Sequence, residues 1–225
     1  MKKYAVIVAG GSGLRMGTQV PKQFLLLGGK PVLWHTLTVF LEAYEDLDII
    51  LVLPEEHLET GKAILYSTQA PQRIRMVTGG TTRFQSVKNG LRYVEEESVI
   101  FVQDGVRCLL TTSLIHRCYD KAVEYGAAIP VIDSKDSVRL VTPEGNVAMD
   151  RSRVKLVQTP QTFLSGILLP SFRVEYQELF TDEASVVEAS GHKVHLVEGE
   201  PHNIKITTPE DLVLAEQLLI LFSKE

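Results

Sequence analysis

Short apolar segments alternate with amphipathic segments along most of the chain, and this alternation is what most limits the possible folds. Residues 4–9 are apolar throughout, rich in β-branched side chains and followed by glycines, which is typical of a strand buried on both faces. From Pro31 onward, apolar residues recur with the spacing of one helix face. Further strands are predicted at 48–53, 74–77, 99–102, 127–131 and 193–197, with a short one around Lys205. Further helices are predicted after Pro54, at 84–94, 114–125, 164–175 and 182–190, and after Thr208. Buried strands that alternate with helices predict a mostly parallel sheet with helices on both faces.

The alternation is interrupted between Ile132 and Thr159. Residues 138–141 and 147–149 flank the sequence Thr-Pro-Glu-Gly-Asn, a pattern that predicts a β-hairpin. This insertion is too small to fold alone, so we expect it to pack on the domain or on a second subunit. The prediction is a single domain, 1–225, that carries an inserted dimerisation arm at 132–159, called the arm below.

Composition excludes several classes of protein. The net charge of −5 argues against a non-specific nucleic-acid binder, which normally presents a basic stripe, so a phosphate site has to be a local basic pocket. Cys108 and Cys118 are the only cysteines, too few for a disulfide framework, and we expect both to be reduced in a cytoplasmic protein. No apolar run approaches the roughly 20 residues that cross a bilayer, and we expect no membrane association.

A glycine-rich loop follows the first predicted strand. Residues 9–17 read Ala-Gly-Gly-Ser-Gly-Leu-Arg-Met-Gly, and Pro-Lys-Gln follows at 21–23. Small residues allow backbone N–H groups to approach an anionic or planar ligand. In an open parallel sheet, ligands bind at the carboxyl ends of the strands, where this loop lies. The loop is therefore a candidate phosphate site, with Arg15 and Lys22 as its basic residues.

Two common phosphate-binding motifs do not fit this region. A P-loop requires Ser or Thr after Gly-Lys, but Pro31 follows Gly29 and Lys30. A dinucleotide-binding fingerprint requires a third small residue where Met16 stands, and an acidic residue where Leu53 stands. A different kind of nucleotide site is therefore expected.

Several further segments carry clustered polar residues in a characteristic order. They are Gly-Gly-Thr-Thr-Arg-Phe-Gln-Ser-Val-Lys-Asn-Gly at 79–90, Asp-Gly-Val-Arg at 104–107, Asp-Arg at 150–151, Gln-Thr-Pro-Gln at 158–161, Thr-Asp-Glu-Ala-Ser at 181–185 and Asn-Ile-Lys-Ile-Thr at 203–207. With the glycine-rich loop, these segments resemble the 2-C-methyl-D-erythritol 4-phosphate cytidylyltransferase family, and the similarity covers essentially the whole chain.

The resemblance implies an α/β, Rossmann-like fold with a mostly parallel sheet, helices on both faces and a β-hairpin arm. It also implies an enzyme that transfers CMP from CTP to 2-C-methyl-D-erythritol 4-phosphate in non-mevalonate isoprenoid synthesis, releasing pyrophosphate. A divalent cation, expected to be Mg²⁺, would bridge the triphosphate with few protein ligands. No side-chain cluster of the kind that forms a dedicated metal site is predicted.

The same resemblance assigns roles to individual residues. Arg15 and Lys22 are the expected catalytic residues at the α-phosphate, since a planar fork and a compact charge suit phosphoryl oxygens. The expected nucleotide-binding residues are Ala9, Gly10, Gly11, Gly80, Ser86 and Lys205. The expected substrate-binding residues are Asp104, Arg107, Ser137 and Arg151.

In that family the arm is exchanged across a homodimer, and an arginine and a hydroxyl of one subunit hold the polyol phosphate of the other. Arg151 matches the arginine, and Ser137 or Ser134 matches the hydroxyl. A ribitol-5-phosphate cytidylyltransferase and a non-catalytic nucleotide-binding module are the alternatives. The pair Asp150 and Arg151 favours the first reading over the ribitol enzyme, and the basic pair of the glycine-rich loop favours an enzyme over a binding module.

Overall fold

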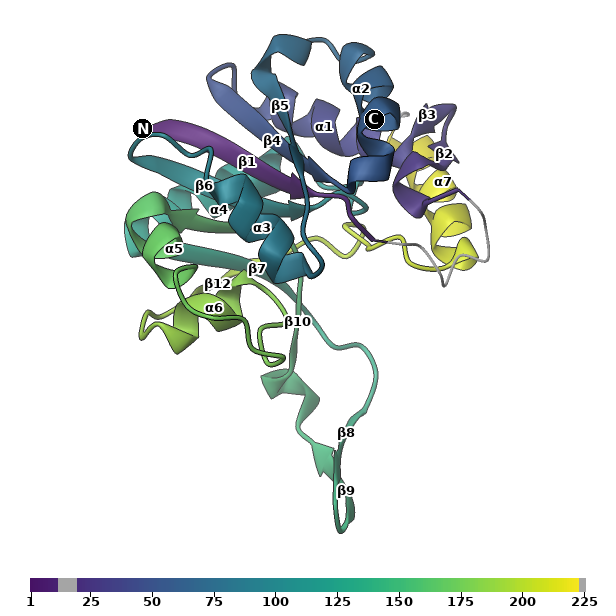
Figure 1. Cartoon of the computed structure of the whole chain (residues 1–225). Helices are drawn as coiled ribbons and strands as arrows, with labels where there is room; N and C mark the ends of the chain where they lie inside the picture. The colour runs from purple at the N-terminus through teal and green to yellow at the C-terminus, as the bar shows by residue number, and fades with distance from the viewer. Residues whose placement is uncertain (12–19, 223–225) are drawn as a thin grey trace.

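A computed structural model describes residues 1–11 and 20–222, and its main element is an eight-stranded sheet (Figure 1). The strand order is β10-β7-β11-β6-β1-β4-β5, with β12 also paired to β7. The strands are β1 (Lys2–Val8), β4 (Leu47–Leu53), β5 (Ile74–Thr78), β6 (Ser98–Asp104), β7 (Ala127–Asp133), β10 (Lys155–Val157), β11 (Gln161–Leu164) and β12 (His195–Glu198). Parallel pairing joins β6, β1, β4 and β5, and also β12 and β7.

Most helices pack on the two faces of this sheet, and the last one packs beside it. They are α1 (Val32–Ala43), α2 (Leu58–Tyr66), α3 (Arg83–Leu91), α4 (Thr112–Tyr125), α5 (Ser165–Ser171), α6 (Glu183–Ala189) and α7 (Pro209–Phe222), with short 3-10 turns at Lys22–Phe24, Glu55–His57, Pro71–Arg73 and Arg151–Arg153. Side chains alternate along β1, so that Ile7 packs in the cluster with α1, α2 and α4, and Val6 packs in the cluster with α3, α5 and α6. The predicted architecture, a mostly parallel sheet covered on both faces, is confirmed.

One strand in the middle of the sheet departs from the predicted pattern. The antiparallel β11 lies between β6 and β7, in a region where the sequence predicted only a helix from residue 164. That helix, α5, begins at Ser165 and ends earlier than predicted. Because Gln161 and Thr162 are polar, β11 lacks the apolar pattern of a buried strand, although both residues are buried. Gln161 compensates for its burial by bonding to the Asp182 carboxylate at 2.8 Å and to the backbone N–H of Ala184 at 2.8 Å.

The segment that carries Lys205 is not the short strand that the sequence predicted. Residues 203–207 have irregular backbone, attached to the sheet through a bond from Ile206 N–H to the Val106 carbonyl at 3.0 Å. The following helix begins at Pro209 as predicted, and Asp211 accepts bonds from the backbone N–H groups of Thr207 and Thr208 at 2.8 Å each. This acidic residue in the first turn therefore caps the start of the helix.

A small layer beside the sheet holds α7 in place. The two-stranded ribbon β2 (Leu26–Leu27) and β3 (Lys30–Pro31) packs with α7 around a separate apolar cluster that contains Leu27, Val106 and Ala215. This cluster joins the ribbon to the loop after β6. Among the described helices, none combines the length and the apolarity that crossing a membrane requires.

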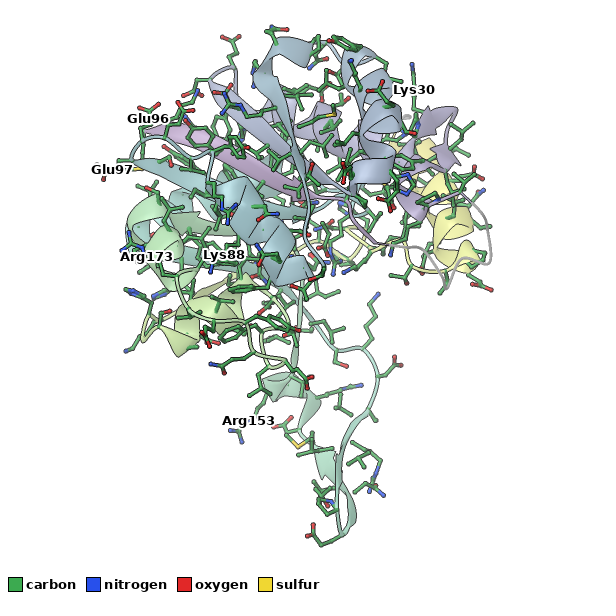
Figure 2. The ribbon with its side chains drawn as sticks, viewed as in Figure 1. Lys30, Lys88, Glu96, Glu97, Arg153 and Arg173 are labelled. Atoms are coloured by element: carbon green, nitrogen blue, oxygen red, sulfur yellow. The ribbon has the colours of Figure 1, made fainter. Side chains whose placement is uncertain are left out.

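The arm extends away from the body of the molecule (Figure 1). Its tip is the antiparallel hairpin of β8 (Val138–Thr142) and β9 (Gly145–Met149), and its second leg returns through β10, which pairs with β7. The exposed apolar side chains of the hairpin are Leu140, Val141, Val147 and Met149. Arg153, in the turn that precedes β10, also points outward from the arm (Figure 2).

Candidate active site

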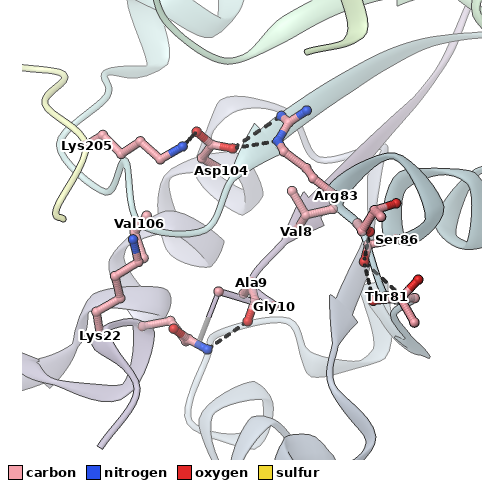
Figure 3. Close-up of a pocket in the computed structure, with 14 residues that line it drawn as sticks. Val8, Ala9, Gly10, Lys22, Thr81, Arg83, Ser86, Asp104, Val106 and Lys205 are labelled. Carbon is pink, nitrogen blue, oxygen red and sulfur yellow. Dashed lines mark hydrogen bonds and ion pairs between the residues drawn. The ribbon is translucent and has the colours of Figure 1, made fainter. Parts of the chain in front are cut away.

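A cavity of about 300 Å³ lies at the carboxyl ends of β1 and β6 (Figure 3). Its walls come from the end of β1, the 3-10 turn at Lys22–Phe24, the loop before α3, the end of β6 and the segment before α7. The lining residues are Val8, Ala9, Gly10, Gly11, Lys22, Gln23, Gly80, Thr81, Thr82, Arg83, Ser86, Asp104, Val106 and Lys205. The structure therefore gathers Lys22, Asp104 and all the predicted nucleotide-binding residues around one space.

Lys22 reaches the cavity from the 3-10 turn. Its side chain is largely buried and extends toward Val106 (Figure 3). The neighbouring Gln23 donates from Nε2 to the Ala9 carbonyl at 2.8 Å, which ties the turn to the end of β1. The Lys22 amine is thus held on a fixed support beside the small residues that follow β1. Arg15, its predicted partner, lies outside the described residues.

The loop before α3 forms the opposite wall. A Cβ atom placed on Gly80 would overlap the Gln85 side chain and lie 3.2 Å from the Gln85 carbonyl carbon, so that larger residues do not fit here. The Ser86 hydroxyl accepts a bond from Gly80 N–H at 3.0 Å and donates to the Thr82 carbonyl at 2.9 Å. Ser86 is buried and faces the cavity, and its hydroxyl fixes the loop conformation.

Asp104, the last residue of β6, is surrounded by three cationic side chains. Its Oδ1 accepts bonds from Nε and Nη2 of Arg83 at 3.3 and 3.2 Å, and its Oδ2 lies 2.9 Å from Nζ of Lys205 and 3.7 Å from Nε of Arg107. Burial alone would raise the pKa of the Asp104 carboxyl, but the charges of Arg83 and Lys205 outweigh it and hold this pKa at about 2. Asp104 is therefore an ionised carboxylate at neutral pH.

Arg83 and Glu183 complete this network, and neither was predicted as a site residue. The Glu183 side chain is 1% exposed and makes two contacts with the Arg83 guanidinium, one of them between Oε2 and Nη2 at 3.0 Å. Burial raises the pKa of Glu183, and the Arg83 charge opposes this effect. Both residues lie within the polar segments at 79–90 and 181–185, but nothing in the sequence indicates that the two segments meet.

A second cavity of about 210 Å³ adjoins the first. Arg83, Asp104 and Lys205 line both cavities and form the wall between them. The second cavity is also lined by Arg107, Val157, Gln158, Thr159, Gln161, Thr181 and Asp182. The predicted substrate-binding residues Asp104 and Arg107 thus meet at this cavity, next to the predicted nucleotide site.

A buried set of amide contacts fixes Arg107 and the segment before Lys205. Arg107 donates from Nη1 to the Asn203 carbonyl at 2.9 Å, and the Asn203 side chain donates to the Thr159 carbonyl at 2.8 Å. Gln158 donates from Nε2 to the Glu200 carbonyl at 2.8 Å. The polar segments at 158–161 and 203–207 therefore act together, because each holds the other in place.

The predicted arm residues lie apart from both cavities of their own chain. Ser137 and Arg151 are exposed, and Arg151 donates from Nη1 to the Lys135 carbonyl at 3.0 Å. Ser134, the alternative hydroxyl, donates to the Asp136 carbonyl at 3.1 Å. None of these three residues lines either cavity.

Among the described residues, no cluster of three or more His, Cys, Asp or Glu side chains has the arrangement of a metal site. Asp104 is the one carboxylate among the described residues that line the first cavity, and it is already paired with cations. This donor set fits a cation carried by the phosphates of a nucleotide, and it does not fit a preformed cage.

Small residues after β1, a buried lysine and an ion-paired carboxylate lie together at the carboxyl edge of a Rossmann-like sheet, an arrangement typical of nucleotide-binding α/β proteins. The family model for 2-C-methyl-D-erythritol 4-phosphate cytidylyltransferase matches residues 4–220, and the chain belongs to this family. The resemblance noted from the sequence is confirmed.

Individual relatives agree with this assignment. The 2-C-methyl-D-erythritol 4-phosphate cytidylyltransferase of Bacteroides thetaiotaomicron is 48% identical over 219 residues, which cover 97% of this chain and 100% of the relative. The enzyme of the same name from Porphyromonas gingivalis is 47% identical over 97% of this chain and 98% of its own length. The solved structure of 4-diphosphocytidyl-2C-methyl-D-erythritol synthase from Anaerococcus prevotii superposes with a TM-score of 0.84 at 30% identity, covering 97% of this chain and 98% of the other.

Proposed function

We propose that the protein transfers CMP from CTP to 2-C-methyl-D-erythritol 4-phosphate, giving 4-diphosphocytidyl-2-C-methyl-D-erythritol and pyrophosphate, a step of non-mevalonate isoprenoid synthesis. The family match over residues 4–220 carries this proposal. Two adjoining cavities at the carboxyl edge of the sheet support it, since the reaction requires two anionic substrates in contact.

The first cavity takes CTP in this proposal. Backbone groups of Ala9, Gly10, Gly11 and Gly80, with Ser86, surround the base and ribose. The Lys22 amine, with Arg15, meets the α-phosphate. A phosphate oxygen of the polyol phosphate attacks the α-phosphorus in line, the bond from that phosphorus to the β-phosphate oxygen breaks, and pyrophosphate leaves. Fixed positive charge stabilises the charge that spreads over the phosphoryl oxygens in the transition state.

The second cavity takes the polyol phosphate. Arg107, whose guanidinium is held by the Asn203 and Val157 carbonyls, supplies positive charge to this cavity, and Lys205 supplies a positive charge on the wall shared with the nucleotide. The ionised Asp104 carboxylate is suited to accept hydrogen bonds from polyol hydroxyls. Because Asp104 and Lys205 line both cavities, they bring the attacking phosphate next to the α-phosphorus.

The arm supports a homodimer in this proposal. Its exposed apolar side chains, among them Val141, are suited to a protein–protein contact, and in this proposal they are buried against a second copy of the chain. Arg151, with Ser137 or Ser134, then reaches the polyol phosphate of the partner subunit. This arrangement explains why the arm residues lie away from the cavities of their own chain.

A magnesium ion and a cytoplasmic location complete the proposal. When bound, Mg²⁺ neutralises charge on the triphosphate, which carries it into the first cavity. Among the described residues that line the first cavity, Asp104 is the carboxylate that would be available to such an ion or to its water ligands. Cys108 and Cys118 are buried free thiols, in keeping with a reducing compartment.

The test is pyrophosphate release with each of the four nucleoside triphosphates, combined with 2-C-methyl-D-erythritol 4-phosphate or ribitol 5-phosphate. We expect turnover with CTP and the methylerythritol phosphate to exceed every other combination. A clear preference for ribitol 5-phosphate would assign the protein to the alternative reaction, and binding of CTP without turnover in any combination would contradict an enzymatic role.

A further inference from the structure

Glu183 is a buried carboxylate whose partner in the described part of the chain is Arg83. It lies in the first turn of α6 and its side chain points to the wall between the two cavities, without lining either of them. Arg83 donates to Glu183 through Nη1 and Nη2 and to Asp104 through Nε and Nη2. The guanidinium is thus held between two carboxylates that are far apart in sequence.

Helix stability alone does not explain a buried glutamate at this position. The start of α6 is already capped by Asp182 and Ser185, which exchange side-chain and backbone hydrogen bonds in a capping box. Removing a carboxylate from water is costly, and well-packed apolar residues often serve equally well in the interior. The contact that Glu183 adds is the one that fixes the orientation of Arg83.

We propose that Glu183 is a positioning residue for the transfer reaction: it holds the Arg83 guanidinium against Asp104, so that the wall between the two substrate cavities keeps one geometry. The inference rests on the proposed function, because it assigns the two cavities to the two substrates. Glu183 itself touches neither substrate, and it acts through Arg83 and Asp104.

The charge balance of the wall predicts a distinctive kinetic effect. Arg83, Arg107 and Lys205 surround Asp104, and Glu183 supplies the second negative charge. When Glu183 is replaced by Gln, the net charge beside both cavities rises by one, which favours binding of anionic substrates. The loosely held Arg83 no longer fixes Asp104, and small displacements of positioning groups reduce turnover strongly.

The experiment compares Glu183→Gln, Glu183→Asp and Ser185→Ala in steady-state kinetics with CTP and 2-C-methyl-D-erythritol 4-phosphate. For Glu183→Gln we expect kcat to fall by about tenfold or more, while KM for both substrates stays unchanged or falls. Glu183→Asp keeps the charge but is one methylene shorter, so its kcat should lie between those of wild type and Glu183→Gln. Ser185→Ala breaks the capping box of the same helix and should lower Tm while keeping the wild-type kcat.

Two results would overturn the inference. The first is a wild-type kcat in Glu183→Gln, whether or not the KM values for the two substrates rise. The second is a loss of kcat in Ser185→Ala as large as that in Glu183→Gln, when the two variants have the same Tm. A wild-type protein without turnover would refute the proposed function instead. In that case, crystal structures of wild type and Glu183→Gln would decide the positioning role. The role requires that the contact between Arg83 and Asp104 be present in the wild type and lost in the variant.

Discussion

Replacing Asp104 by Asn should destabilise the protein in a pH-dependent way. The three cations around this carboxylate hold its pKa at about 2, against 3.8 for an unperturbed aspartate. A difference of this size corresponds to about 2 kcal/mol of stabilisation at pH 7, since one pKa unit is worth about 1.4 kcal/mol. For a protein of this length, the loss should lower Tm by roughly 4–8 °C.

The sign of the pH dependence follows from the lowered pKa. The stabilisation is fully present above the unfolded-state pKa, falls to about half by roughly pH 3, and is lost as the pH drops through the folded-state value near 2. The difference between wild type and Asp104→Asn should therefore shrink as the solution is acidified.

The measurement is urea denaturation of wild type and Asp104→Asn at pH 7, 5, 4 and 3, with the free energy of unfolding extrapolated to water. Glu124→Gln is the matched control, because it removes an exposed carboxylate that pairs with Lys121 on the surface, where ion pairs contribute little. Equal stability of Asp104→Asn and wild type at pH 7 would refute the reasoning, as would a difference that stays constant down to pH 3.

Three further predictions concern catalysis and support of the site. Lys22→Ala should lower kcat by about 10²–10³-fold, because it removes fixed charge at the reacting phosphate; calorimetry should still detect CTP, and normal turnover would contradict the catalytic role. Arg151→Ala should raise KM for the polyol phosphate more than KM for CTP, and equal effects on both would exclude a role in binding the polyol phosphate. Asn203→Ala should lower the free energy of unfolding by about 1–3 kcal/mol, because it leaves the Thr159 carbonyl without its 2.8 Å partner, and an unchanged denaturation midpoint would show that this contact is dispensable.

The fold could be predicted from the sequence wherever burial dictated composition. Residues 4–7 of β1 and 49–53 of β4 are apolar and buried, so the apolar runs identified these strands, and helical periodicity identified the helices between them. The antiparallel β11 was missed because Gln161 and Thr162 are polar, and their burial depends on contacts with segments that are distant in sequence. The strand predicted around Lys205 was wrong for a related reason, since Asn203 and Ile206 are held by tertiary contacts.

The segments that form the candidate site could be predicted from the sequence, but the contacts between their side chains could not. The glycine-rich loop and the order of the polar segments led to Ala9, Gly80, Asp104 and Lys205, which the structure gathers around one cavity. Their individual roles stay predictions. The pair of Arg83 and Glu183 joins residues that are 100 positions apart, and a single sequence carries no signal for such a pairing.

The direction of β11 also has a consequence for how much the arm can vary. Because β11 runs opposite to β6 and β7, the chain leaves for the arm at the carboxyl end of β7 and returns to the sheet at the same end. No further connection across the sheet is needed. Residues added to or deleted from the tip of the hairpin therefore leave every strand of the sheet in register. The protein can change the reach of this projection while its core stays intact, as is usual for surface insertions.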